Sequence, residues 1–286
     1  MRPMILSIAV IVLLTACGDD EAPGLECPPG EEVNPISGQC TRASEPEPDP
    51  DPEPDPDPEP DPTPILCEPS MDLDSHTECF FFAHSPSTLY RIDPFREIVE
   101  PLFGVPEGLF DIDTTPSGAL YGISITTLYR YDYDTEQWNT VGDMGVIENA
   151  NGLCVNMDGQ AYMTASDKLY LLDLNTAQAT QVGSMGWSFN SSGDCVIDKG
   201  NRIFMSSDAS IGHDTLVEID GSTAAASTVG STGFSQIYGL TAAWGLLIGT
   251  TGTGNVILID PQTGQGELLF NAAGIEFYGA ASTPER

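Results

Sequence analysis

Three aspartates are the residues of this sequence best suited to acid–base chemistry. Asp111 and Asp113 stand in one expected β-strand, and Asp194 stands in another. Glycoside hydrolysis needs an acid and a base or nucleophile that face each other across a sugar. These aspartates are therefore the candidate catalytic residues for one hypothesis, a hydrolase or lyase that acts on an extracellular polysaccharide.

A calcium loop is suggested by three carboxylates, Asp132, Asp134 and Glu136, because calcium needs several hard oxygen ligands around one ion. The same turn reads Asp173-Leu-Asn175 and Asp260-Pro-Gln262 elsewhere. Asp and Asn side chains cap tight turns without any metal. We therefore predict no metal at this turn, and calcium is the alternative.

Other catalytic motifs are missing from the sequence. There is no GxSxG nucleophile elbow, Walker phosphate loop or HExxH zinc motif. No two cysteines form a CxxC pair, and the histidines His76, His84 and His213 are scattered, which argues against a structural zinc site or a thioredoxin-type redox site. We expect no cofactor. The formal charge of −34 excludes nucleic-acid binding through a basic surface.

The strands that carry these residues follow an internal repeat. From Cys79 onward the chain is rich in Gly, Thr, Ser, aromatic and β-branched residues and lacks helical periodicity, which indicates an all-β domain. An LYxID pattern recurs five times, at spacings of 39, 41, 47 and 40 residues. A period of about 40 residues holds four short strands, the size of one propeller blade. The five copies are Leu89–Asp93, Leu128–Asp132, Leu169–Asp173, Leu216–Asp220 and Val256–Asp260.

Two weaker patterns support the same period. A turn glycine precedes four of the copies, and a Val-Gly pair follows three of them. The turn glycines are Gly118, Gly159, Gly200 and Gly245, and the Val-Gly pairs end at Gly142, Gly183 and Gly230.

The two ends of the repeat region predict how the ring closes. The amino end supplies three strands, 79–84, 88–93 and 98–103, and the carboxyl end supplies one leftover strand, 276–282. Together they make a fifth blade, which leaves no exposed sheet edge. We predict a five-bladed β-propeller over residues 65–286, closed by the carboxyl-terminal strand. An open β-sandwich is the alternative.

The LYxID and Val-Gly patterns resemble the repeats of periplasmic YVTN-like, NHL-like and quinoprotein-like propellers, over most of residues 79–286. The resemblance implies a blade in which Leu and Ile fill the core between sheets and Asp closes a turn. It implies no particular chemistry. The WD dipeptide and the Asp-box pattern SxDxGxxW, which mark other propeller families, are absent. A five-bladed ring also resembles certain glycosidases, which keeps the hydrolase hypothesis open.

Cysteine usage agrees with an exported protein. Cys17 apart, six cysteines remain, an even number that suits an oxidising compartment. Six thiols allow fifteen pairings. A bond between Cys154 and Cys195 would join two blades, because both occupy the same position of successive inner strands. Two buried free thiols are the alternative. Spacing favours the pairs Cys27 with Cys40, Cys67 with Cys79, and Cys154 with Cys195.

The loops that lead into the inner strands are the predicted binding surface. In propellers these loops open onto one mouth of the central channel. Four amide or carboxylate residues recur three positions before a strand glycine, with aromatic residues beside them, a mixture typical of small-ligand and glycan sites. Capping of loop backbone and sealing of the ring are the alternative roles. The candidate rim residues are Asn149, Asn190, Gln236, Glu276, Trp187, Phe189, Phe234 and Tyr238.

The amino end predicts export and lipidation. Arg2 precedes an apolar run over residues 4–14, which is too short to span a bilayer and is typical of a signal peptide. The run ends in Leu14-Thr15-Ala16-Cys17, which resembles the bacterial lipobox. The resemblance implies that residues 1–16 are removed and that Cys17 carries a diacylglyceryl group and an acyl chain such as palmitate. An ordinary secretory signal is the alternative.

The segments after Cys17 predict a tether. Residues 17–44 form a short cysteine-containing segment, and residues 45–64 alternate Glu or Asp with Pro. This composition cannot bury apolar area and repels itself, so we predict an extended, disordered linker. At about 3.1 Å per residue it would span about 60 Å.

Together these features predict a lipoprotein of the cell envelope whose propeller is a noncatalytic binding module for a glycan, peptide or protein. Gly18 follows Cys17 where an aspartate would signal retention, so the lipobox resemblance favours the outer membrane. The polysaccharide hydrolase or lyase, with Asp111 and Asp113 in its site, is the alternative function.

Overall fold

The computed structural model describes residues 27–29, 31–33, 39–42, 79–145, 149–208 and 212–284. The chain divides into two compact units, Met1–Thr63 and Pro64–Arg286. Cys17, Cys67, the predicted signal peptide and the predicted linker lie outside the described residues. None of the residues that the structure describes forms a helix long and apolar enough to cross a membrane.

The first unit contains one small hairpin. Strand β1 (Glu31–Val33) pairs antiparallel with β2 (Cys40–Arg42). The predicted disulfide between Cys27 and Cys40 is present here, with 5.6 Å between the two Cα atoms. A disulfide suits a segment too short to form a core of its own.

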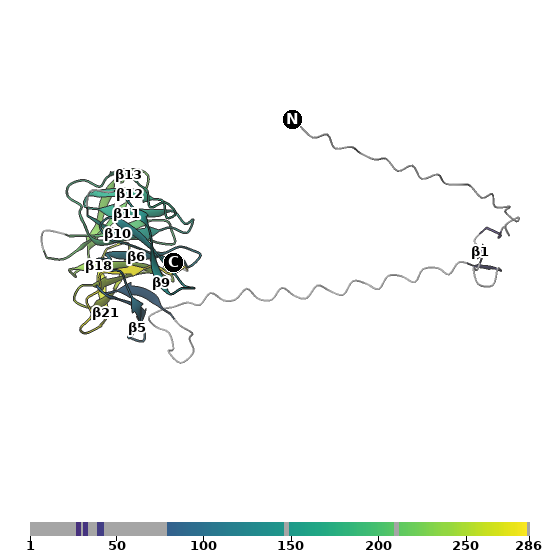
Figure 1. Ribbon diagram of the computed structural model, residues 1–286, viewed down its shortest axis with the longest axis horizontal. Coiled ribbons are helices and arrows are strands. Elements are labelled where there is room, and N and C mark those ends of the chain that lie inside the picture. The colour runs from purple at the N-terminus through teal and green to yellow at the C-terminus, as the bar shows by residue number, and fades with distance from the viewer. Residues whose placement is uncertain are drawn as a thin grey trace, which may run out of the picture. The chain divides into compact units, whose positions relative to one another are not determined.

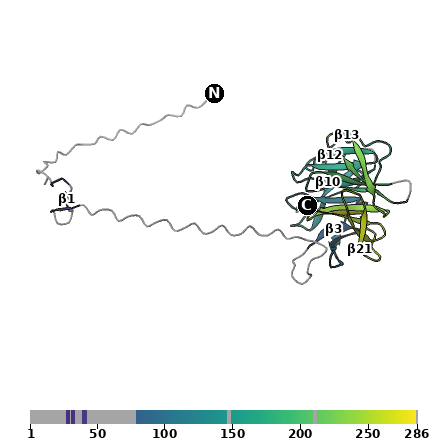
Figure 2. The ribbon, with the colours of Figure 1, turned by 180° about the vertical axis from the view of Figure 1, so that it is seen from behind.

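The described residues of the second unit form five four-stranded antiparallel sheets, so the predicted all-β, five-bladed propeller is confirmed. Figures 1 and 2 show these sheets in two opposite views. Each blade is given from its inner strand outward. Blade I contains β22 (Gly279–Ala281), β3 (Phe81–His84), β4 (Thr88–Asp93) and β5 (Ile98–Gly104). Blade II contains β6 (Asp111–Thr114), β7 (Leu120–Ile123), β8 (Thr127–Asp132) and β9 (Gln137–Asp143).

The other three blades follow in chain order. Blade III contains β10 (Ala150–Val155), β11 (Ala161–Ala165), β12 (Lys168–Leu172) and β13 (Ala179–Ser184). Blade IV contains β14 (Ser191–Ile197), β15 (Ile203–Ser207), β16 (Thr215–Ile219) and β17 (Ala226–Ser231). Blade V contains β18 (Ile237–Ala243), β19 (Leu246–Thr251), β20 (Asn255–Ile259) and β21 (Gly266–Asn271).

The ring is closed by the carboxyl-terminal strand, as the sequence predicts. Strand β22 pairs antiparallel with β3, with Gly279 opposite His84 and Ala281 opposite Phe82. The inner strands β6, β10, β14, β18 and β22 each contact the next one around the ring.

The LYxID pattern builds the third strand of every blade and the turn that follows it. Its first and fourth residues are buried between sheets, for example Leu89 and Ile92 in blade I. Its aspartate closes the turn: Asp132 Oδ1 accepts hydrogen bonds from the N–H groups of Asp134 (2.9 Å) and Thr135 (3.3 Å). These N–H groups also lower the pKa of Asp132. Asp93, Asp173, Asp220 and Asp260 cap their turns in the same way.

The Val-Gly pattern packs one blade against the next. A Cβ atom on Gly142 of blade II would lie 3.1 Å from the Ala177 Cβ in the turn of blade III. Gly183 meets Ala224 of blade IV in the same manner. The glycines are therefore required by close approach between blades.

Candidate functional site

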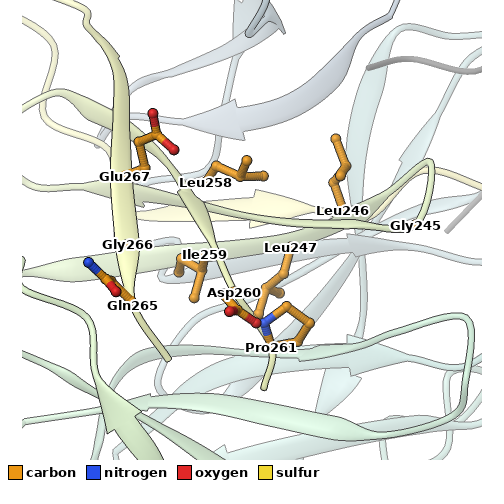
Figure 3. Close-up of a pocket in the computed structure, with 10 residues that line it drawn as sticks. All are labelled: Gly245, Leu246, Leu247, Leu258, Ile259, Asp260, Pro261, Gln265, Gly266 and Glu267. Carbon is orange, nitrogen blue, oxygen red and sulfur yellow. The ribbon is translucent and has the colours of Figure 1, made fainter. Parts of the chain in front are cut away.

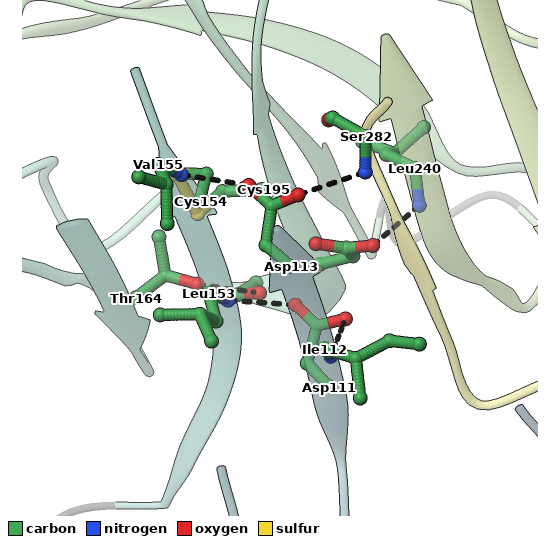
Figure 4. The surroundings of a disulfide bond; sticks show 12 residues. Asp111, Ile112, Asp113, Leu153, Cys154, Val155, Thr164, Cys195, Leu240 and Ser282 are labelled. Atoms are coloured by element: carbon green, nitrogen blue, oxygen red, sulfur yellow. Dashed lines mark hydrogen bonds between the residues drawn. A yellow bond between two sulfur atoms is a disulfide. The ribbon is translucent and has the colours of Figure 1, made fainter. Parts of the chain in front are cut away.

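The three aspartates predicted as candidate catalytic residues lie on the inner strands, where they join blades. Asp111 Oδ2 accepts a hydrogen bond from the N–H of Leu153 at 2.6 Å. Asp113 accepts from Val155 N–H at 2.7 Å and from Ser282 N–H at 2.8 Å. Figure 4 shows these bonds radiating from β6 toward the neighbouring inner strands.

Asp194 completes this group, which we call the axis cluster (Asp111, Asp113 and Asp194). Its Oδ2 accepts a hydrogen bond from Leu240 N–H in blade V. The cluster therefore supplies acceptors to inner-strand N–H groups of blades I, III and V. An inner strand is paired on one side only, so its other N–H groups need acceptors when they are buried.

The axis cluster is closed to a polysaccharide. The side chains of Asp111 and Asp194 have no exposed surface, and Asp113 is 2% exposed. Burial and the neighbouring Asp194 raise the pKa of Asp111 well above its usual range, and burial raises that of Asp194. Asp194 Oδ1 has no hydrogen-bond donor among the described residues. A proton shared between the Asp111 and Asp194 carboxyl groups would satisfy this oxygen, since two adjacent buried carboxyls cannot both ionise at low cost.

A disulfide crosses the same junction. Cys154 of β10 and Cys195 of β14 are bonded, with 5.5 Å between their Cα atoms, which confirms the predicted link between blades III and IV. Figure 4 shows it beside Asp113. Cys79 is also disulfide-bonded, and its predicted partner Cys67 lies outside the described residues. The axis of the ring is thus held together by a disulfide and by hydrogen bonds from backbone N–H groups to buried aspartates.

A different arrangement is found where the loops enter the inner strands of blades IV and V. A cavity of about 430 Å³ opens there, which we call the loop-face cavity. It brings together three of the predicted rim residues, Asn190, Gln236 and Tyr238. Its lining residues are Asn190, Ser191, Ser192, Asp208, Gly212, Asp214, Ser235, Gln236 and Tyr238.

Asp214 is the buried acidic residue of the loop-face cavity and is only 4% exposed. Its Oδ2 accepts hydrogen bonds from Ile237 N–H (2.6 Å) and from the Ser192 hydroxyl (3.3 Å). Burial raises the pKa of Asp214 to about 6, although these two donors act in the opposite direction. The negative charge of Asp208 adds to the increase.

Tyr238 gives the loop-face cavity an aromatic wall. Its ring lies 6.0 Å from that of Tyr278, and Gly252 leaves the space that the ring occupies. Burial, followed by the charge of Asp214, raises the pKa of the Tyr238 phenol. Gln236 has a left-handed backbone (φ 58°), a strained conformation for a non-glycine residue that is often found at functional sites.

The other predicted rim residues divide into two groups. Asn149 and Glu276 are exposed but are not among the described residues that line the loop-face cavity. Trp187 is 89% exposed, on the loop that leads to Asn190. Phe189 packs against the core around Cys195, and Phe234 packs over Gly266.

Sequence prediction missed Asp208 and Asp214. They are the first and last residues of the connection between β15 and β16, which runs from Asp208 to Asp214. In blade III the corresponding strands are connected by Ser166 and Asp167 alone. The sequence signal that could have indicated this longer connection is the 47-residue spacing between the third and fourth LYxID copies, in a repeat of about 40 residues. Loops extended from a rigid scaffold commonly carry function.

A second groove lies on blade V, away from any predicted site. Its volume is about 540 Å³. Figure 3 shows its lining residues, among them Leu246, Leu247 and Leu258, with Glu267 and Gln265 on the β21 side. It offers mainly apolar surface and few polar groups that could orient a ligand, so it is the weaker candidate.

At the turn where calcium was the alternative, Asp132 Oδ1 accepts hydrogen bonds from the backbone N–H groups of Asp134 and Thr135. Within the described parts of the chain, no three His, Cys, Asp or Glu side chains are grouped so that they could hold a metal ion.

Comparison with known proteins shows the fold alone. No family model matches the sequence, and no curated protein matches it. A solved chain from the nidogen/laminin complex is similar, with 12% identity over 72% of this chain and 99% of that chain and a TM-score of 0.50. A chain of Kuenenia stuttgartiensis hydrazine synthase aligns at 19% identity over 56% of this chain and 48% of that one, about half its length, with a TM-score of 0.42. The resemblance of the repeats to YVTN-like, NHL-like and quinoprotein-like propellers therefore stays a prediction.

Proposed function

We propose that this protein is a noncatalytic saccharide-binding module held at the cell envelope, with the loop-face cavity as its ligand site. One observation carries the proposal: the cavity gathers amides, hydroxyls, carboxylates and an aromatic ring from two blades around about 430 Å³ of space. Sugars present hydroxyl groups and apolar ring faces, and such a lining matches both. The axis cluster is buried, and Asp111 and Asp113 already accept hydrogen bonds from backbone N–H groups, so it is closed to a saccharide.

The anchoring part of the proposal rests on the lipobox-like ending at Cys17. A lipid on Cys17 and an extended segment over residues 45–64 would present the propeller at a distance from the bilayer. Metabolic labelling with an alkyne analogue of palmitate tests this part. We expect label in the full chain and none in Cys17→Ser; absence of label from the parent chain would contradict lipidation.

Binding is tested by presenting the full chain, purified in mild detergent, to a glycan array. We expect retention of a restricted set of saccharides. The double variant Asp208→Ala/Gln236→Ala should weaken the affinity for these saccharides about tenfold or more, because each lost hydrogen bond costs about 0.5–1.5 kcal/mol.

Asn149→Ala is the matched control, because Asn149 holds the equivalent loop position in blade III, is exposed, and lies outside the lining of the cavity. It should leave affinity unchanged. A folded chain that retains no saccharide, or a double variant that binds as the parent does, would overturn the proposal.

A further inference from the structure

The loop-face cavity has negative charge without a matching positive charge. Two carboxylates, Asp208 and Asp214, line it, and no Lys or Arg is among its described lining residues. The chain as a whole is also strongly negative, with a formal charge of −34. A ligand that enters this cavity meets a negative potential in a partly desolvated space, where charge interactions are stronger than in water.

The surroundings of Asp214 lack a strong positive charge that would compensate its carboxylate. Its side-chain partners are neutral donors, Ile237 N–H and the Ser192 hydroxyl. The titratable groups that face it are Asp208, which repels its charge, Tyr238, and the exposed His213, which favours its ionised form weakly. A buried carboxylate is costly when no cation compensates it. An ammonium group placed between Asp214 and Asp208 would provide that compensation.

We infer that the loop-face cavity binds an amino sugar, with its protonated amine between the carboxylates of Asp208 and Asp214. The inference rests on the proposed function and adds the ligand class to it. Asn190, Gln236 and the serine hydroxyls bind the sugar hydroxyls, and the Tyr238 ring covers an apolar sugar face and attracts the ammonium through its π-electrons.

Other cationic ligands fit the same observations less well. A bare metal ion requires several carboxylate or histidine ligands grouped around it, and the described residues contain no such group. A lysine side chain of a peptide would use the two carboxylates but leave most amide and hydroxyl groups of the cavity unpaired. The volume of about 430 Å³ lies in the range of small-molecule sites.

Binding of this kind depends on pH in a defined direction. Burial raises the pKa of Asp214 to about 6, so the carboxyl is mostly ionised at pH 6.5 and mostly protonated at pH 4.5. The two carboxylates of the cavity favour the protonated form of the bound amine across this interval. If ionised Asp214 holds the amine, affinity falls about tenfold or more as pH falls from 6.5 to 4.5.

The test compares two trisaccharides of the same length, β-1,4-linked glucosamine and its fully N-acetylated form, by calorimetry with the full chain at pH 6.5 and pH 4.5. We expect the glucosamine trisaccharide to bind about tenfold tighter than the acetylated one at pH 6.5, and to lose this preference at pH 4.5. Asp214→Asn should show no preference at either pH. Asp208→Asn, at an exposed position, should reduce the preference at pH 6.5 severalfold, and this variant provides the test if Asp214→Asn does not fold.

The outcomes separate this inference from the proposed function. Equal or tighter binding of the acetylated trisaccharide would overturn the amino-sugar inference and leave saccharide binding intact. Binding of a lysine-rich hexapeptide in place of either trisaccharide would also overturn it. If neither trisaccharide binds and the glycan array is blank as well, both proposals fail.

Discussion

Two sets of aspartates in the same ring have different roles. In the axis cluster, Asp111, Asp113 and Asp194 accept hydrogen bonds from N–H groups of neighbouring inner strands and have almost no exposed surface. In the loop-face cavity, Asp214 has a strained glutamine and a tyrosine for neighbours, together with open space. Residue type alone therefore does not mark a site. What distinguishes the two sets is whether the acceptor oxygens are already occupied by the fold.

The largest effect should come from breaking the axis cluster at Asp113. Asp113→Ala leaves the N–H groups of Thr114, Val155 and Ser282 without this acceptor in the interior. We expect the free energy of unfolding to fall by about 3–5 kcal/mol, measured by urea denaturation. Asp208→Ala, at an exposed position, should change it by less than about 0.5 kcal/mol. A loss at Asp113 as small as at Asp208 would erase the distinction between the two sets.

The disulfide across the axis should have the next largest effect. Cys154→Ser/Cys195→Ser opens a covalent loop of sequence separation 41. Loop-closure entropy predicts a loss of about 2–4 kcal/mol, visible as a lower thermal midpoint under non-reducing conditions. Replacing Cys27 and Cys40 by serine is the control, because that bond lies in the first unit and should leave the propeller transition in place. Equal midpoints for parent and axis variant would contradict a fastening role.

The shared proton predicts the direction of the pH dependence. Because the pKa values of Asp111 and Asp194 are raised in the folded chain, their contribution to stability is present at low pH and is lost as pH rises through the folded values. Asp194→Asn supplies a fixed donor toward Asp111 while keeping an acceptor for Leu240 N–H. We expect this variant to lose less stability than the parent between pH 5 and pH 8. An identical pH slope would argue against the shared proton.

The smallest effect on stability is expected in the loop-face cavity. Gln236→Gly removes the cost of a left-handed backbone at φ 58° and should raise the free energy of unfolding by about 0.5–1 kcal/mol. The same change should weaken saccharide binding, because it removes an amide from the cavity. A variant that is less stable and binds unchanged would show that Gln236 serves the fold.

Much of the architecture could be predicted from the repeat. The LYxID pattern predicts which residues are buried, since its apolar first and fourth positions fill the core in every blade. The leftover strands at the two ends of the repeat region predict ring closure. Cys154 and Cys195 could be paired because the repeat placed them at equivalent positions of adjacent inner strands.

The candidate site was less predictable, for physical reasons. The rim residues were chosen by their repeated position, yet Asn149 and Glu276 do not share a cavity with Asn190 and Gln236. The cavity depends on a departure from the repeat, the longer connection that carries Asp208 and Asp214. The role of the axis cluster depends on which backbone N–H groups lack a sheet partner, and a linear sequence does not display that.

The most direct test compares saccharide affinity in two variants at a temperature where both are folded. We predict that Asp208→Ala/Gln236→Ala keeps the thermal midpoint of the parent and binds about tenfold more weakly or worse. We predict that Cys154→Ser/Cys195→Ser lowers the midpoint and binds as the parent does. The reverse pattern, with affinity lost in the axis variant and kept in the cavity variant, would contradict the division between fold and site.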